Sequence, residues 1–131
     1  MTARRLIVSG DDFGAAVAVN AGIERAHRDG ILTSTSLMVA GAAMADAVAH
    51  AQGMPSLAVG LHLVLAQDRP TSPPERIRRL VRRDGRFGDK PILSGLRYAW
   101  AWCSRIGRAQ LRAELVAQLD AFHQTGLPLA H

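Results

Sequence analysis

The stretch LIVSGDDFG, residues 6–14, sets the fold class of this chain. Its first three residues favour a β-strand, and the polar, glycine-containing corner that follows predicts that this strand ends at Ser9. The apolar residues Val19, Ile23 and Ala26 then recur at helical spacing as far as the stop at Asp29 and Gly30. The stretch therefore predicts a short strand followed at once by a helix over 15–28.

The same alternation continues along the chain. Residues 33–39 are rich in β-branched side chains, 42–52 have helical spacing, and 57–63 form a nearly continuous apolar run that contains His62. Such a run is typical of a strand covered on both faces in a parallel sheet. The order β-α-β-α-β with short connections therefore predicts an α/β fold with a parallel sheet, either open or closed into a barrel.

The pattern changes after Val64. Three of the six prolines lie in 68–74, and the arginine-rich stretch around 77–81 allows at most a short helix. We interpret 68–106 as an insertion or lid. The clearest helix is 106–125, with a stripe formed by Leu111, Leu115, Leu119 and Phe122, and 127–131 would begin a fourth strand.

The insertion permits two interpretations. Leu96, Tyr98, Trp100 and Trp102 lie near arginines, as in a segment that contacts a membrane surface. The alternative, which we favour, is ordinary packing of a lid, because the segment lacks a clean amphipathic period.

Composition limits the function classes. With 131 residues and 48% apolar side chains the chain is globular, but a complete eight-stranded (β/α) barrel needs about 250 residues. The net charge of +5 comes with only 5% aromatic residues, which argues against a stacking platform for single strands. We expect no nucleic-acid partner, and binding through the arginines is a weaker alternative. Cys103 is the only cysteine, and the sequence has no signal-peptide or membrane-spanning run. We therefore expect a cytoplasmic protein, at most one at the inner membrane surface.

Polar side chains gather where predicted strands end. Asp11 and Asp12 follow the first strand and His62 ends the third, so a parallel sheet would bring all three to one rim. One carboxylate could bind a divalent cation while the other takes a proton from water. The alternatives are a simple turn at the aspartates and a hydrogen-bonded core position for His62. We interpret the three helical histidines as surface or packing residues: His27, His50 and His123.

Four segments together resemble the YdjC-like carbohydrate deacetylases. They are 6–14 (LIVSGDDFG), 19–23 (VNAGI), 30–34 (GILTS) and 59–63 (VGLHL). The resemblance implies a parallel (β/α) barrel of the glycoside hydrolase/deacetylase type. It also implies that residues 1–131 are the N-terminal part of a single barrel domain, cut to its first strands and helices.

The resemblance assigns roles to individual residues. It implies that Asp12 and His62 are metal ligands and that Asp11 is the general base, and it makes Asn20 a candidate substrate-binding residue. His131 would be the leading histidine of a His-x-Asn/Asp-x-His motif whose second histidine, the third ligand, would stand at position 135. The resemblance implies Mg²⁺, although two imidazoles and a carboxylate also suit Zn²⁺, Co²⁺ or Fe²⁺. With two of three ligands, we expect the 131-residue chain alone to be inactive.

Three further details point to one branch of that family. Gly10 before the aspartate pair, 36–41 (SLMVAG) and 125–129 (TGLPL) look most like the branch associated with hopanoid biosynthesis, whereas Ala130 stands where that branch usually has an acidic residue. The implied substrate is an acetylglucosaminyl hopanoid lipid. Two alternatives are a chito-oligosaccharide deacetylase and an inactive remnant that serves only as a binding or structural fragment.

Overall fold

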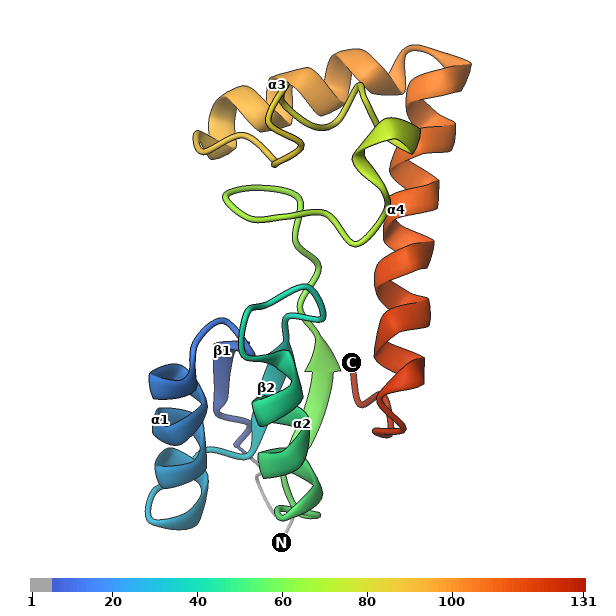
Figure 1. Cartoon of the computed structure of the whole chain (residues 1–131). Helices are drawn as coiled ribbons and strands as arrows, with labels where there is room; N and C mark the ends of the chain where they lie inside the picture. Colours follow the sequence, from blue (N-terminus) through green and yellow to red (C-terminus); the bar gives the residue numbers. More distant parts are fainter. Residues whose placement is uncertain (1–5) are drawn as a thin grey trace, which may run out of the picture.

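Two successive strand-helix units and a third strand form the first part of the molecule (Figure 1). The structure is a computed structural model that describes residues 6–131. Its elements are β1 (Ser9–Phe13), α1 (Val17–Arg28), β2 (Ser34–Leu37), α2 (Met44–Gln52), β3 (Ala58–Leu61), the 3₁₀ turn η1 (Pro74–Arg76), α3 (Pro91–Trp102) and α4 (Arg105–Gln124).

The three strands form one parallel sheet in the order β1-β2-β3. This order and direction confirm the predicted parallel α/β architecture. Past α4, the chain returns to the free side of β3, where the Ala130 N–H donates to Val59 O and the Leu61 N–H donates to His131 O. These bonds lie where a fourth strand was predicted, although no strand is assigned at 127–131. A closed barrel is not formed by the described residues and stays a prediction.

The prediction for the first strand was wrong in its position. Strand β1 begins at Ser9, where it was expected to end, and includes both aspartates. The reason is that main-chain pairing with the neighbouring strand, which no local pattern reveals, decides where this strand runs. Ser9 lies opposite Ser34 and Gly10 lies opposite Thr35, while Val8 O already accepts hydrogen bonds from the start of that partner segment.

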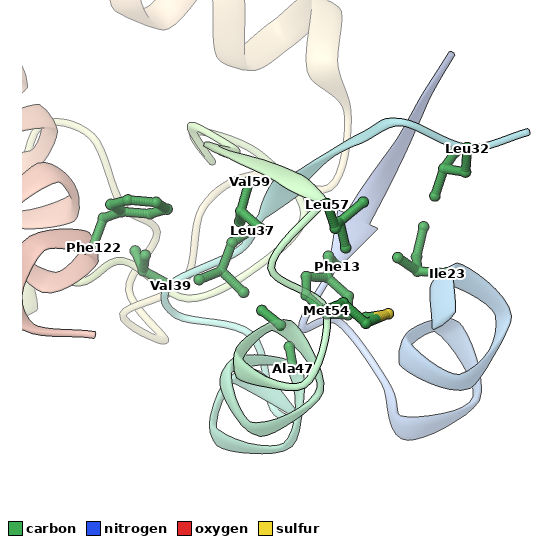
Figure 2. Packing of buried hydrophobic residues seen from close by; sticks show 11 residues of the cluster. Phe13, Ile23, Leu32, Leu37, Val39, Ala47, Met54, Leu57, Val59 and Phe122 are labelled. Atoms are coloured by element: carbon green, nitrogen blue, oxygen red, sulfur yellow. The ribbon is translucent and has the colours of Figure 1, made fainter. Parts of the chain in front are cut away.

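The core lies between the sheet and the two helices α1 and α2 (Figure 2). Phe13 from β1 and Leu37 from β2 are fully buried and pack with Ala47 of α2. Phe122, from the far end of α4, is fully buried in the same cluster and lies beside Val39 in Figure 2. The last turns of α4 therefore close the core that the strand-helix units begin.

Residues 64–104, which we call the arm, extend away from the sheet and return through α4 (Figure 1). A second apolar cluster fills the arm, with Ile77, Leu80 and Phe87 fully buried. No helix is assigned at 77–81, where the sequence allowed at most a short one: the only helical turn before α3 in this part of the described chain is η1 at Pro74–Arg76. Ile77 and Leu80 are buried in turns, so their apolar character reflects burial and not a helix.

Helix α3 was not predicted. Pro91 lies in its first turn, where a missing N–H costs nothing, and the helix runs for 12 residues to Trp102. Its apolar residues lie on both faces of the helix: Ala101 is buried, while Ile92 and Trp100 are 81% and 71% exposed. This distribution hides the helical period in the sequence. This exposure is compatible with both membrane contact and lid packing, which stay predictions.

Helix α4 was predicted almost to the residue, and of the predicted apolar stripe only Phe122 is fully buried. The three leucines of the expected stripe are only partly buried. The buried positions are Gly107, Glu114, Gln118 and Phe122. Two of these, Glu114 and Gln118, are polar. Within residues 6–131, no helix is long and apolar enough to cross a membrane.

Candidate active site

The backbone of β1 is irregular at its two aspartates. The pairing of β1 with β2 shifts register between Gly10 and Phe13, and Asp12 has a φ of 65°. In a regular strand, consecutive side chains point to opposite faces, so Asp11 and Asp12 could not serve one site. A bulge with one residue in the left-handed region, which Asp tolerates better than most, redirects the side chains. The irregularity therefore brings both carboxylates to one rim of the sheet.

A chain of polar contacts joins the three predicted site residues through a fourth. Ser36 Oγ of β2 donates to Asp11 Oδ1 at 2.9 Å and lies 2.9 Å from His62 Nδ1. The other ring nitrogen, His62 Nε2, lies 3.5 Å from Asp12 Oδ1. The backbone N–H of His62 also donates to the backbone carbonyl of Leu37, and this bond fixes the histidine just past the end of β3. Sequence reasoning brought Asp11, Asp12 and His62 together but missed Ser36.

The separation of Asp12 Oδ1 and His62 Nε2 fits two ligands of one cation. At 3.5 Å it is longer than the 2.7–2.9 Å typical of a hydrogen bond between charged groups. Two donors held about 2.1 Å from an ion at the tetrahedral angle would lie about 3.4 Å apart. One carboxylate oxygen and one imidazole nitrogen are also donors that Zn²⁺, Co²⁺ and Fe²⁺ accept. Across residues 6–131, no group of three or more His, Cys, Asp or Glu side chains could hold a metal ion.

A cavity of about 360 Å³ opens beside these donors. Asp12, His62 and Met38 line it together with the segment 63–68, where the arm begins. A larger cavity of about 770 Å³ lies within the arm between Pro74 and Arg97, and its lining includes none of the predicted site residues. The smaller cavity is therefore the one that a molecule reacting at the aspartates would enter.

Two buried polar residues of α4 bind the first part of the arm, Gln118 at the cavity wall and Glu114 just beyond it. Gln118 makes two hydrogen bonds to Val64, accepting from its N–H at 2.9 Å and donating to its carbonyl at 2.7 Å. The carboxylate of Glu114, fully buried, accepts from the N–H groups of Thr71 and Ser72 at 2.8 Å each. Their spacing of four residues on one helix face was visible in the sequence, but we assigned that face to leucines.

His131 lies against β3. Its carbonyl accepts the hydrogen bond from Leu61, and its ring lies so close to Gly60 that a Cβ at that glycine would come within 2.6 Å of the imidazole. A side chain added at position 60 would therefore displace the histidine ring. A place for His131 beside β3, the strand that directly precedes His62, agrees with the resemblance, and its role in a ligand motif stays a prediction.

Asn20 occupies a buried position behind the rim. Its side chain accepts from the Gly14 N–H at 2.8 Å and donates to Ala43 O at 3.0 Å and to Asp46 Oδ2 at 2.7 Å. With no exposed surface, Asn20 ties the turn after β1 to the start of α2. These contacts are structural, and they give no support to the substrate-binding role, which stays a prediction.

The remaining histidines lie away from the rim. His27 contacts Leu32 O and Ser56 Oγ, at 2.7 and 2.9 Å, and His50 lies 2.7 Å from Glu24 between α1 and α2. His123 is exposed on α4. Their contacts are those of packing and surface residues, as predicted.

Known proteins resemble this chain over nearly its full length. Carbohydrate deacetylases of Brevibacillus brevis and Oceanobacillus iheyensis are 38% and 35% identical to it, each over 97% of this chain but only 47% and 51% of their own length. The crystal structure of an Enterococcus faecalis V583 protein, described as acting in cellobiose-phosphate cleavage, superposes with a TM-score of 0.81 at 30% identity. That match covers 95% of this chain and 46% of the other.

The chain thus spans about half the length of the curated relatives it matches. Residues 5–131 match the family model described as YdjC-like protein, which includes every residue of the candidate site. On the strength of that match, the chain belongs to the YdjC-like protein family.

Proposed function

We propose that this chain provides part of the active site of a carbohydrate deacetylase that uses a divalent cation to hydrolyse the N-acetyl group of an amino sugar. The observation that carries the proposal is the spacing of Asp12 Oδ1 and His62 Nε2, 3.5 Å apart, at the rim where Asp11 lies. The identity of 35–38% to proteins named carbohydrate deacetylase supports it.

Each residue has a distinct task in this proposal. Asp12 and His62 hold the cation, which when bound polarises the amide carbonyl and makes water a better nucleophile at neutral pH. Asp11 accepts the proton from that water as general base. Its Oδ1 is engaged by Ser36, so Oδ2 is the oxygen that takes the proton. The cavity of about 360 Å³ beside Asp12 accommodates the acetyl group and the adjoining part of the sugar.

For the substrate we propose an acetylglucosaminyl hopanoid lipid. The support is the resemblance of Gly10, 36–41 and 125–129 to the hopanoid-associated branch. An N-acetylated chito-oligosaccharide is the alternative, since the same chemistry at the amide would serve either molecule. We propose Mg²⁺ as the cation because the family resemblance implies it. Zn²⁺ and Co²⁺ are the alternatives, and the imidazole donor and the tetrahedral spacing suit them better.

The test is release of acetate. A chain extended to the length of its relatives, with Mg²⁺, Zn²⁺ or Co²⁺ added in turn, is incubated with an N-acetylglucosaminyl lipid and with N-acetylated chitobiose. We expect acetate release that needs the cation and falls at least about 10²-fold in Asp11→Asn, as for loss of a general base. Asp29→Asn, which removes an exposed carboxylate at the end of α1, should retain full activity.

Two outcomes would contradict the proposal. Equal turnover by the Asp11→Asn variant would show that this carboxylate is not the base. Absence of acetate release from both substrates, in an extended chain that binds the cation, would show that the substrate or the reaction is another one. The 131-residue chain measured in parallel should be inactive.

A further inference from the structure

Ser36 lies between two groups that the proposed reaction uses. It belongs to β2, is 7% exposed, and places its hydroxyl 2.9 Å from a carboxylate oxygen of Asp11 and 2.9 Å from Nδ1 of His62. In the proposed reaction this hydroxyl only occupies Asp11 Oδ1, and its contact with His62 has no assigned task. Its position nevertheless determines how the protons in the chain of contacts are arranged.

The number of protons settles the direction of each hydrogen bond. A serine hydroxyl has a single proton to donate, and an ionised carboxylate can only accept. The Ser36 proton therefore points to Asp11 Oδ1, and the hydroxyl oxygen is left to accept from Nδ1–H of His62. In a neutral imidazole, a proton on Nδ1 leaves Nε2 with a free lone pair. That lone pair faces Asp12 Oδ1 across 3.5 Å.

We propose that Ser36 is a positioning residue that holds His62 in the Nδ1–H form and so presents the Nε2 lone pair, together with Asp12, to a cation. The same hydroxyl keeps Asp11 in a fixed orientation relative to that ligand. Histidine ligands of metals commonly donate their second N–H to an acceptor that fixes the ring, and Ser36 is that acceptor in this chain. The inference rests on the proposed function for its cation but not for the proton arrangement.

The neighbouring residue provides a matched control. Thr35 is also in β2 and also directs a hydroxyl towards β1, where Oγ1 donates to Gly10 O at 2.7 Å. Adjacent residues of a strand point to opposite faces, so Thr35 lies on the other face of the sheet from Ser36. Thr35→Val removes a buried hydroxyl without touching Asp11 or His62.

The experiment uses ¹⁵N NMR of the imidazole nitrogens in the 131-residue chain without metal, at a pH where the His62 ring is neutral. In the unmodified chain we expect a protonated Nδ1 and a bare Nε2. Ser36→Ala should shift the proton towards Nε2, which can then donate to Asp12. Ser36→Thr, which retains a hydroxyl, and the Thr35→Val control should leave the proton on Nδ1.

A second measurement is the affinity for Co²⁺ or Zn²⁺ in the extended chain. Ser36→Ala should weaken binding about 10–100-fold, the loss typical of removing the partner of a metal-binding histidine, while Thr35→Val should not. A proton on Nε2 in the unmodified chain would overturn the inference without any variant. Unchanged proton position and affinity in Ser36→Ala would also overturn it. The expected shifts without acetate release from the extended chain would instead overturn the proposed reaction and support the role of Ser36.

Discussion

The sheet half of the molecule (residues 6–63) and the arm (64–104) are held together in different ways. In the sheet half, strands pair through the main chain, and apolar side chains from every strand and helix meet in one core. In the arm, turns, the 3₁₀ turn η1 and the helix α3 surround the smaller second apolar cluster. Hydrogen bonds from single polar side chains connect its segments. For example, the Arg97 guanidinium of α3 donates to the backbone carbonyls of Arg79 and Val81.

The two regions contribute different parts of the candidate site: the sheet half provides its polar side chains, and the arm provides the wall of its cavity. Asp11, Asp12, Ser36 and His62 all come from the sheet half. Ser36 is paired with Gly60 in the main-chain ladder, and the aspartates and His62 lie directly beside paired residues of the strands. The wall of the cavity comes from the start of the arm and depends on side chains of α4. We therefore expect changes in the arm to alter access to the site, and changes in the sheet to abolish the site.

The largest effect should come from the two buried phenylalanines that represent the two clusters. Phe13 and Phe87 are both fully buried. Each change to alanine should lower the free energy of unfolding by about 3–5 kcal/mol, but in different places. Denaturation measures the free energy of unfolding, and hydrogen exchange measures the protection of individual amides. In the exchange experiment, Phe13→Ala should expose the amides of all three strands. Phe87→Ala should loosen the arm alone, and loss of strand protection in that variant would mean that the two regions unfold as one unit.

The next effect concerns the link between α4 and the arm. Glu114→Ala would leave the buried N–H groups of Thr71 and Ser72 without their acceptor, at a cost of about 1–3 kcal/mol. Hydrogen exchange at these two amides should accelerate while exchange in β2 stays slow. Asp120→Ala, an exposed carboxylate on the same helix, is the control and should change neither. Equal protection in the Glu114 variant would show that other contacts hold this segment.

A smaller effect is expected at the junction of α3 and α4. Ser104 caps α4 by accepting from the Gly107 N–H at 3.0 Å, and it also accepts from Arg79 at 2.8 Å. Ser104→Ala should lower the free energy of unfolding by about 1 kcal/mol, whereas Ser104→Asp, which can still cap, should restore it. Thermal denaturation of both variants gives the comparison. A loss of similar size in Ser104→Asp would mean that the hydroxyl's donation to Ala101 O, which a carboxylate cannot make, is the important contact.

The smallest effects should depend on pH, with opposite signs in the two regions. Burial raises the pKa of Tyr98 in the arm, so its contribution to stability is present below the ordinary phenol pKa of about 10 and is lost as pH rises through the folded value. The Arg28 hydrogen bond lowers the pKa of Glu24 on α1, so its contribution is lost as pH falls through the folded value. Tyr98→Phe should remove only the alkaline change and Glu24→Gln only the acid change, in denaturation at several pH values.

Sequence patterns predicted the sheet half better than the arm. Helical spacing at Val19, Ile23 and Ala26 located α1, and the apolar run around Val59 located a strand of a parallel sheet. The same criteria missed α3, because its apolar residues lie on both the buried and the exposed sides. Periodicity reports one-sided burial, so a helix without a single buried face escapes it.

By itself the sequence determined that Asp11, Asp12 and His62 meet at one rim, because short connections between successive β and α segments require parallel strands whose carboxyl ends coincide. Only the tertiary structure decided how these side chains are oriented and what they contact. The left-handed backbone at Asp12 depends on a register shift against β2, and the contacts of Ser36 depend on three strands lying side by side. Both arise from pairing between distant segments, and a local pattern in one strand holds no information about what its neighbours place opposite it.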